Sequence, residues 1–118
     1  MKKSILAGLC LILAAWSGQV FAYGAIAVDD QRGQADPGYG FYIGARSRGD
    51  AERGAMRECR RSGNRDCKVA VWFESCGAYA ASRRYYGIGW GGSRREASNM
   101  ALDKCGSDRC RIVVSRCE

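Results

Sequence analysis

The segments Ser47–Ala51 (SRGDA) and Ser93–Ala97 (SRREA) decide the fold, because they indicate that the chain contains one unit twice. They lie 46 residues apart in the numbering. In each segment a serine is followed by an acidic residue at the third position, a capping-box pattern typical of a helix start. We therefore predict one helix after each serine, in two copies of the same unit.

Small residues follow each predicted helix start at helical spacing. They are Ala51, Ala55 and Cys59 in the first copy and Ala97, Ala101 and Cys105 in the second. A face of small side chains lets a helix lie close against a β-sheet. Gly63 and Gly106 are predicted to end the two helices.

Short runs of β-branched and aromatic residues predict strands around each helix. Val69–Phe73 and Arg111–Val114 follow the helices, and Gly24–Ala27 (GAIA) resembles Gly77–Ala80 (GAYA) at the start of the copies. A second strand is expected before each helix, although its glycines are unfavourable in a strand; these glycines are Gly40, Gly87, Gly89, Gly91 and Gly92. The polar segment Asp29–Pro37 is predicted to be a loop.

These elements predict an α+β fold built from a duplicated strand-strand-helix-strand unit. The first copy spans about residues 23–74 and the second about residues 75–118. We expect the copies to be related by an approximate two-fold axis, with both helices packed on β-sheet.

Residues 1–22 have the pattern of a cleaved signal peptide. Lys2 and Lys3 precede an uncharged apolar run, and Val20-Phe21-Ala22 places small residues at the signal-peptidase positions. Cleavage there would leave one domain, residues 23–118, and would lower the formal charge from +7 to +5 because two lysines and no acids are lost. We expect a secreted or periplasmic bacterial protein with no membrane span after cleavage. An uncleaved anchor and a lipid-modified Cys10 are the alternatives.

Six cysteines remain after Cys10 is removed with the signal peptide, and an even number in a short exported chain predicts three disulfides. In each copy a cysteine at the helix end is followed by one at the next strand, which favours Cys59–Cys67 and Cys105–Cys110. Cys76 and Cys117 remain, and we expect their bridge to join the two copies. Other pairings stay possible on spacing alone. We expect no metal or other cofactor, because the chain has no histidine and no Cys-x-x-Cys pair.

Several of these features together resemble one known family. They are Tyr-Gly-Ala-Ile-Ala at 23–27, the capped helix ending in Cys59, the Cys67-x-Val strand, Cys76-Gly-Ala-Tyr-Ala, and the second helix and strand with Cys105, Cys110 and Cys117. The chain is similar to the small exported bacterial proteins grouped as domain of unknown function 4189. The resemblance implies secretion and a disulfide-bonded α+β module, and it supplies neither catalytic residues nor a ligand.

The chain offers no recognisable catalytic set. The absence of histidine excludes Ser-His-Asp and Cys-His catalysis. A hydrolase based on two carboxylates needs both in one cleft, and the candidates are Asp29, Asp30, Asp36 and Glu74. The three aspartates lie in or beside the predicted loop, where solvated acids are usual. We expect a protein that is not an enzyme, with a small carboxylate-based hydrolase as an alternative.

Arginine and aromatic residues gather in one segment that we interpret as the candidate binding site. It contains Arg83, Arg84, Tyr85, Tyr86, Trp90, Arg94 and Arg95. Guanidinium groups bind phosphate or carboxylate, and rings stack on bases or sugars. If residues 83–90 turn back on themselves, the two arginine pairs approach each other. The alternative interpretation is an ordinary surface, since aromatic residues also fill half-buried strands.

The positive charge and the absence of a catalytic set favour an exported binding module for an acidic partner. The partner would be an anionic polymer or an acidic protein surface, with nucleic acid as a weaker candidate. The alternative is a periplasmic or secreted inhibitor or immunity protein that blocks an enzyme, because a rigid surface loses little entropy on binding. The sequence leaves the ligand and the oligomeric state open.

Overall fold

The structure, a computed structural model, describes residues 22–31, 33 and 35–118, so the predicted signal peptide lies outside the described residues except for Ala22. Two strand-strand-helix-strand units follow each other along the chain. The first contains β1 (Tyr23–Asp29), β2 (Gly38–Ala45), α2 (Arg48–Arg61) and β3 (Lys68–Phe73), and the second β4 (Cys76–Ala81), β5 (Tyr86–Gly91), α3 (Arg94–Cys105) and β6 (Arg111–Cys117). The predicted α+β fold with a duplicated unit is confirmed.

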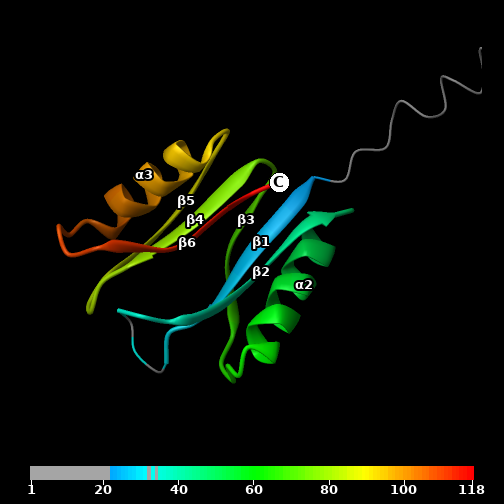
Figure 1. The fold of residues 1–118 in the computed structure, drawn as a ribbon, viewed down its shortest axis with the longest axis horizontal. Helices are drawn as coiled ribbons and strands as arrows, with labels where there is room; N and C mark the ends of the chain where they lie inside the picture. Colours follow the sequence, from blue (N-terminus) through cyan, green and yellow to red (C-terminus); the bar gives the residue numbers. More distant parts are fainter. Residues whose placement is uncertain (1–21, 32, 34) are drawn as a thin grey trace, which may run out of the picture.

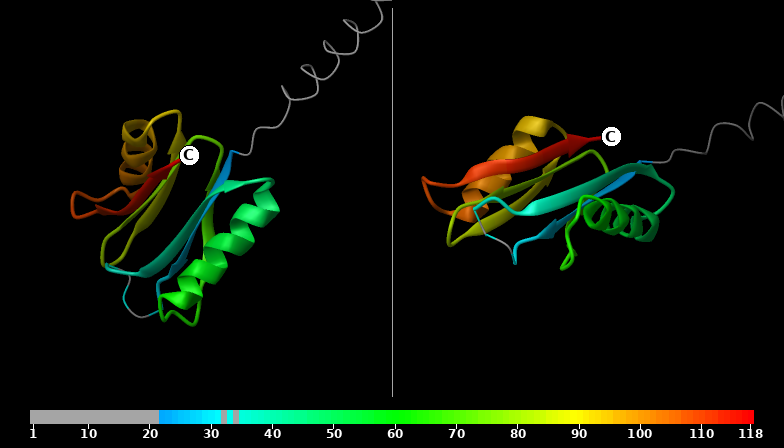
Figure 2. Two further views of the ribbon diagram at one scale, coloured as in Figure 1. Left: turned by 45° about the vertical axis from the view of Figure 1, so that its right-hand side comes forward. Right: turned by 60° about the horizontal axis from the view of Figure 1, so that its bottom comes forward.

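Each unit forms its own three-stranded antiparallel sheet, in the order β2-β1-β3 and β5-β4-β6. The two sheets stack face to face, with α2 on the outer face of the first and α3 on the outer face of the second (Figures 1 and 2). Between the sheets, β3 contacts β5 and β2 contacts β6. An approximate two-fold axis that exchanges the units carries β3 onto β6 and β5 onto β2. The two contacts are therefore equivalent.

The central strand of each sheet is buried on both faces and uses them differently. In β1, Ala25 and Ala27 face α2, whereas Ile26 and Val28 enter the apolar core between the sheets. In β4, Ala78 and Ala80 pack against α3 in the same way, and Tyr79 enters the central core. Period-two alternation thus places small residues against the helices and larger ones between the sheets. Within the described residues, no helix is long and apolar enough to cross a membrane.

Glycines in β2 and β5 allow the helices to approach the sheets closely. A Cβ atom on Gly40 would collide with the backbone nitrogen of Cys59, and one on Gly89 would collide with the carbonyl oxygen of Ala97. Glycine is unfavourable in an isolated strand. The close approach of the helix nevertheless requires glycine at these positions. The predicted small face of each helix is confirmed, because Ala55 and Ala101 are fully buried.

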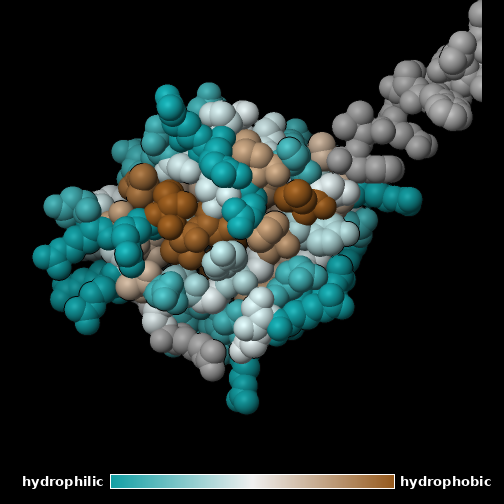
Figure 3. Space-filling model, viewed as in Figure 1, coloured by the Kyte–Doolittle hydropathy of each residue, from teal (hydrophilic) through white to brown (hydrophobic). Residues whose placement is uncertain are grey.

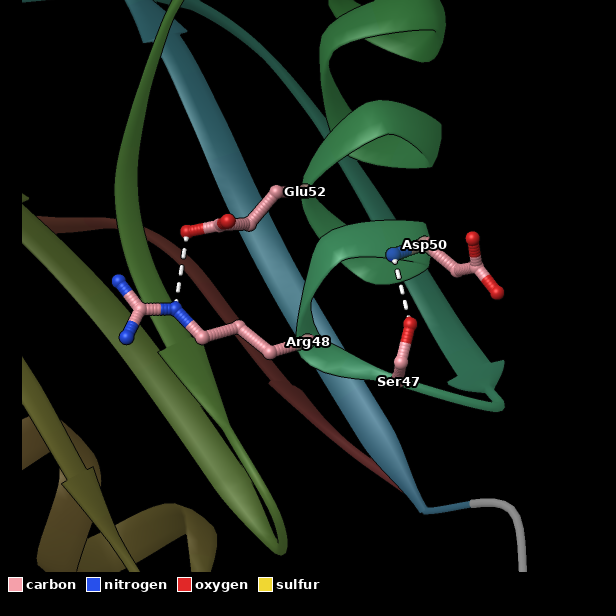
Figure 4. Close-up of polar contacts among 4 residues, drawn as sticks. All are labelled: Ser47, Arg48, Asp50 and Glu52. Atoms are coloured by element: carbon pink, nitrogen blue, oxygen red, sulfur yellow. Dashed lines mark hydrogen bonds and ion pairs between the residues drawn. The ribbon is translucent and has the colours of Figure 1, made fainter.

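Both helices begin and end where the sequence predicts. The hydroxyl oxygens of Ser47 and Ser93 accept the backbone N–H of Asp50 and Glu96, each at 3.1 Å (Figure 4 shows the Ser47 cap). These bonds satisfy amides that would otherwise lack a partner at a helix start. Gly106 caps α3 with a φ of 76°, a left-handed conformation that favours glycine.

The three disulfides pair as the repeat predicts: Cys59–Cys67, Cys76–Cys117 and Cys105–Cys110. One part of the expectation is wrong, because the Cys76–Cys117 bridge does not join the two units. It links β4 to β6, where the two cysteines are direct partners in the strand register, so both lie in the second unit. The three bridges are compatible with a location outside the cytoplasm.

Asp29 is not the solvated loop residue that the sequence suggests. It is the last residue of β1 and is only 1% exposed. Its carboxylate accepts the backbone N–H of Gln31 at 3.0 Å and that of Asp66 at 3.2 Å. A buried carboxylate here ties the loop after β1 to the turn before β3, and this structural role explains its burial.

Candidate binding site

The turn between β4 and β5 and the loop between α3 and β6 meet at one end of the molecule (Figure 1). The strand register causes this meeting, because Ala81 at the end of β4 pairs with Tyr86 on one side and with Arg111 on the other. Within the turn, the amide of Ser82 donates to the carbonyl of Tyr85 at 2.8 Å. The Ser82 hydroxyl also accepts the amide of Tyr85 at 3.1 Å. The turn is therefore held in one shape by its own hydrogen bonds.

A cavity of about 770 Å³ opens between these two segments, and we call it the basic cavity. Four arginines from both segments surround it together with an exposed tyrosine. Its lining residues are Ala35, Ala81, Ser82, Arg83, Arg84, Tyr85, Ser107, Arg109 and Arg111. In Figure 3, long hydrophilic side chains project from this end of the molecule, beside a hydrophobic patch over β6.

Most of the positive charge around the basic cavity is uncompensated. Within residues 22–31, 33 and 35–118, no carboxylate forms an ion pair with the guanidinium of Arg83, Arg109 or Arg111. Arg84 takes part in a further interaction within the protein. The ring of Tyr85 is 55% exposed and offers a flat face beside these cations. The arrangement suits a group that carries negative charge, because several arginines line one cavity and guanidinium groups bind anions.

The structure separates the two arginine pairs that a turn at residues 83–90 would have brought together. Arg83 and Arg84 precede β5, whereas Arg94 and Arg95 follow it at the start of α3. The six residues of β5 hold the pairs apart by about 20 Å at the usual rise of a strand. This exceeds the Debye length of about 8 Å at physiological salt. The expectation that all four arginines share one surface is wrong, because β5 is extended.

The aromatic residues of the predicted site also diverge. Tyr85 lines the basic cavity, but Tyr86 stacks on the buried Tyr79 with ring centroids 5.8 Å apart. Trp90 lines a separate groove at the other end of β5, together with Trp72 and Glu74 from the first unit. Of the seven predicted residues, the structure thus brings only Arg83, Arg84 and Tyr85 together.

Sequence reasoning missed Arg109 and Arg111, which complete the basic cavity. Both flank Cys110, the cysteine that opens the strand after α3. The predicted Cys76–Cys117 pairing was the available signal, because a bridge between these cysteines places β6 beside β4.

The four candidate carboxylates do not form one cleft. Asp29 holds backbone amides, and Asp30 pairs with Lys68 at 3.2 Å. Asp36 lines a smaller cavity of about 250 Å³ beside Arg111. Glu74 follows the opposite end of β3 from Lys68, so the length of that strand lies between Glu74 and Asp30.

Together, the fold and the cavity define a class: a disulfide-stabilised α+β module of two similar units with an arginine-lined cavity at one end. The family model for the domain of unknown function DUF4189 matches residues 23–117. The chain belongs to this family.

A solved structure has a similar fold. The chain is similar to the NMR structure of Rv1813c from Mycobacterium tuberculosis, with 31% sequence identity and a TM-score of 0.62. The match covers 85% of this chain and 78% of that chain. No curated protein sequence matches the chain.

Proposed function

We propose that the protein is an exported, non-catalytic binding module that holds an acidic partner in the basic cavity. One observation carries the proposal: Arg83, Arg109 and Arg111 line the same cavity, and none of their guanidinium groups has an ion-pair partner among the described residues. Some arginines elsewhere on the surface are neutralised locally. On α2, for example, Arg48 pairs with Glu52 and Arg61 pairs with Glu58.

The rigidity of the cavity supports the proposal. Arg83 stands on the hydrogen-bonded turn after β4, and Arg109 lies in the loop closed by the Cys105–Cys110 bridge. Arg111 is the first residue of β6. Because these backbones are held in place before binding, the loss of conformational entropy on binding is small.

The chemistry of the lining indicates the class of ligand. Guanidinium groups form paired hydrogen bonds with phosphate, sulfate or carboxylate groups. The exposed ring of Tyr85 adds a surface on which a base or sugar stacks. We therefore favour an anionic polymer or an acidic protein surface in the periplasm or outside the cell.

The test compares two triple variants that remove the same charge. In the cavity variant, Arg83, Arg109 and Arg111 are replaced by serine. In the control, Arg60, Arg94 and Arg95 are replaced by serine; these exposed arginines do not line the basic cavity. Both proteins are checked for folding by circular dichroism and are then eluted from immobilised heparin with a salt gradient.

The cavity variant is expected to elute at clearly lower salt than the wild type, and the control at nearly the wild-type position. The reason is that counterion release depends on the charges that contact the polymer. Equal shifts in both variants would mean that diffuse surface charge, and not the cavity, holds the polymer. A stoichiometric complex with one acidic protein that survives high salt would instead support the inhibitor alternative.

A further inference from the structure

A groove of about 540 Å³ lies where the free edges of the two sheets meet, and we call it the edge groove. Its walls come from β3 and β5, which are outer strands of their sheets and contact each other across the stack. In the described part of the chain, neither outer edge pairs with another strand. The groove is far from the basic cavity, because it lies toward the opposite end of β5.

The lining of the edge groove differs from the rest of this basic surface. It contains Trp72 and Trp90, which are 36% and 48% exposed, and the half-buried Ile88. Glu74 is the only charged side chain in the lining. Its carboxylate forms no ion pair or side-chain hydrogen bond with any described residue. A net positive protein thus presents a groove lined by two tryptophans and one carboxylate that has no ion pair among the described residues.

Trp72 shows how this surface holds a cation. The guanidinium of Arg48 lies over the Trp72 ring, 4.9 Å from its centroid. The same guanidinium pairs with the carboxylate of Glu52 at 3.3 Å (Figure 4). The Trp72 ring, the Arg48 cation and the Glu52 carboxylate thus interact as a group of three. A cation over an indole face is favourable.

At Trp90 two members of such a set are present and the third is missing. Trp90 and Glu74 line the same groove, but no described cation lies over the Trp90 ring. The opposite edge of the stack, between β2 and β6, carries a ring–cation contact made within the protein. There Arg116 of β6 lies over the ring of Phe41 in β2, 4.5 Å from its centroid.

We propose that the edge groove binds an arginine or lysine side chain that a partner protein presents on an extended segment. The cation lies over the Trp90 ring and pairs with the Glu74 carboxylate. The partner backbone runs along the free edge of β3 or β5, where main-chain groups are available for strand addition. This inference does not depend on the basic cavity.

The probe is a blocked pentapeptide of sequence Thr-Val-Arg-Val-Thr, compared with two peptides that carry glutamine or glutamate in place of arginine. Binding is followed through the indole N–H resonances of Trp72 and Trp90 in the exported protein. The proteins compared are the wild type, Glu74→Gln and Trp90→Leu. Asp103→Asn and Tyr42→Leu serve as matched controls, because these two exposed residues lie outside the groove and outside the basic cavity.

The arginine peptide is expected to shift both indole resonances in a saturable manner and to bind more tightly than the glutamine peptide, with the glutamate peptide weakest. Each groove variant should weaken binding by about two- to fivefold, as expected for one exposed cation–π contact or one exposed ion pair. The two controls should bind as the wild type does.

Three results would overturn the proposal. The first is absence of saturable binding by the arginine peptide at millimolar concentration, and the second is equal binding of the arginine and glutamine peptides. The third is a wild-type dimer, detected by light scattering, that Trp90→Leu dissociates. That result would show that a second copy of this chain, and not a partner protein, occupies the groove.

Discussion

Glu118 fastens the two units to each other through the backbone of Gly44. Both oxygens of its carboxylate accept the Gly44 amide, at 3.0 and 2.8 Å. Gly44 belongs to β2 in the first unit, whereas Glu118 follows β6 in the second. Because no disulfide joins the units, this contact adds to the central core in holding them together.

We expect Glu118→Ala to lower the free energy of unfolding by about 1 kcal/mol, the usual scale for one hydrogen bond to a partly exposed charged group. Urea unfolding measures the effect. Asp103→Ala is the control, since Asp103 is an exposed acid on α3 without a hydrogen bond or ion pair among the described residues. Equal stability of both variants would contradict the fastening role.

Two glycines near each other in the chain provide a test of the helix–sheet contact. A Cβ atom on Gly89 would collide with backbone atoms of α3, whereas one on Gly92 has its nearest neighbour at 3.6 Å. We expect Gly89→Ala to destabilise the fold by about 1–3 kcal/mol through overpacking. Gly92→Ala should change stability far less. Thermal unfolding compares the two, and similar midpoints would mean that α3 can move away from β5 at little cost.

Tyr79 is predicted to make the fold sensitive to alkaline pH. It is 1% exposed, and burial, followed by the charges of Asp30 and Tyr86, raises its pKa from 10.0 to about 12. The unfolded chain therefore loses the Tyr79 proton near pH 10, while the folded protein keeps it. Stability should fall as pH rises from about 10 toward 12, by up to about 2 to 3 kcal/mol.

The Tyr79→Phe variant should lose this part of the pH dependence. At neutral pH it should be at least as stable as the wild type, because the buried Tyr79 hydroxyl has no hydrogen-bond partner among the described residues. Urea unfolding at neutral pH and at about pH 11 measures both effects. Tyr42→Phe, at an exposed position, should follow the wild type at both values. A less stable Tyr79→Phe protein at neutral pH would show that the hydroxyl has a partner.

The disulfides are expected to differ in their contributions. Cys76–Cys117 spans 41 residues, whereas Cys105–Cys110 spans 5. Chain-entropy estimates give about 4 kcal/mol for the longer loop and about 2 kcal/mol for the shorter. Replacing both cysteines of a pair by serine should therefore destabilise the protein more for the longer loop. The reverse order would mean that strain or unfolded-state structure, and not loop length, sets the contribution.

Export can be tested at the start of the mature chain. Cleavage after Ala22 predicts that the native protein begins at Tyr23, which is also the first residue of β1. Mass spectrometry of protein recovered from the periplasm and the medium measures this directly. Recovery of intact Met1 in a membrane fraction would contradict the signal-peptide prediction.

Much of the fold could be predicted because each element expected in one copy of the repeat could be compared with the corresponding element in the other copy. Ser47 and Ser93 predicted both helix starts, and the shared order of cysteines predicted two pairings and left Cys76 and Cys117 as the third. The second strand of each unit was harder to predict, because its glycines are explained only by the helix packed against it. Strand propensity describes each strand by itself. Glycine is required at position 89 because a Cβ atom there would collide with α3.

The candidate site was only half predictable for a similar reason. Arg83, Arg84 and Tyr85 are contiguous, so sequence proximity identified them. Arg109 and Arg111 join them only through the β4–β6 pairing. Arg94 and Arg95 were included because they are close in sequence, although an extended strand between them and the turn keeps the two pairs apart.

The face that each sheet turns toward the other has a consequence for the ancestry of the chain. A single strand-strand-helix-strand unit would leave Ile26, Val28, Val71 and Phe73 uncovered on one side of its sheet. Such a unit would need a second copy to cover that face, so the simplest ancestor is a dimer of identical units. The two edges of the stack differ today: at one, Arg116 lies over the ring of Phe41, and at the other Trp72 and Trp90 line the edge groove.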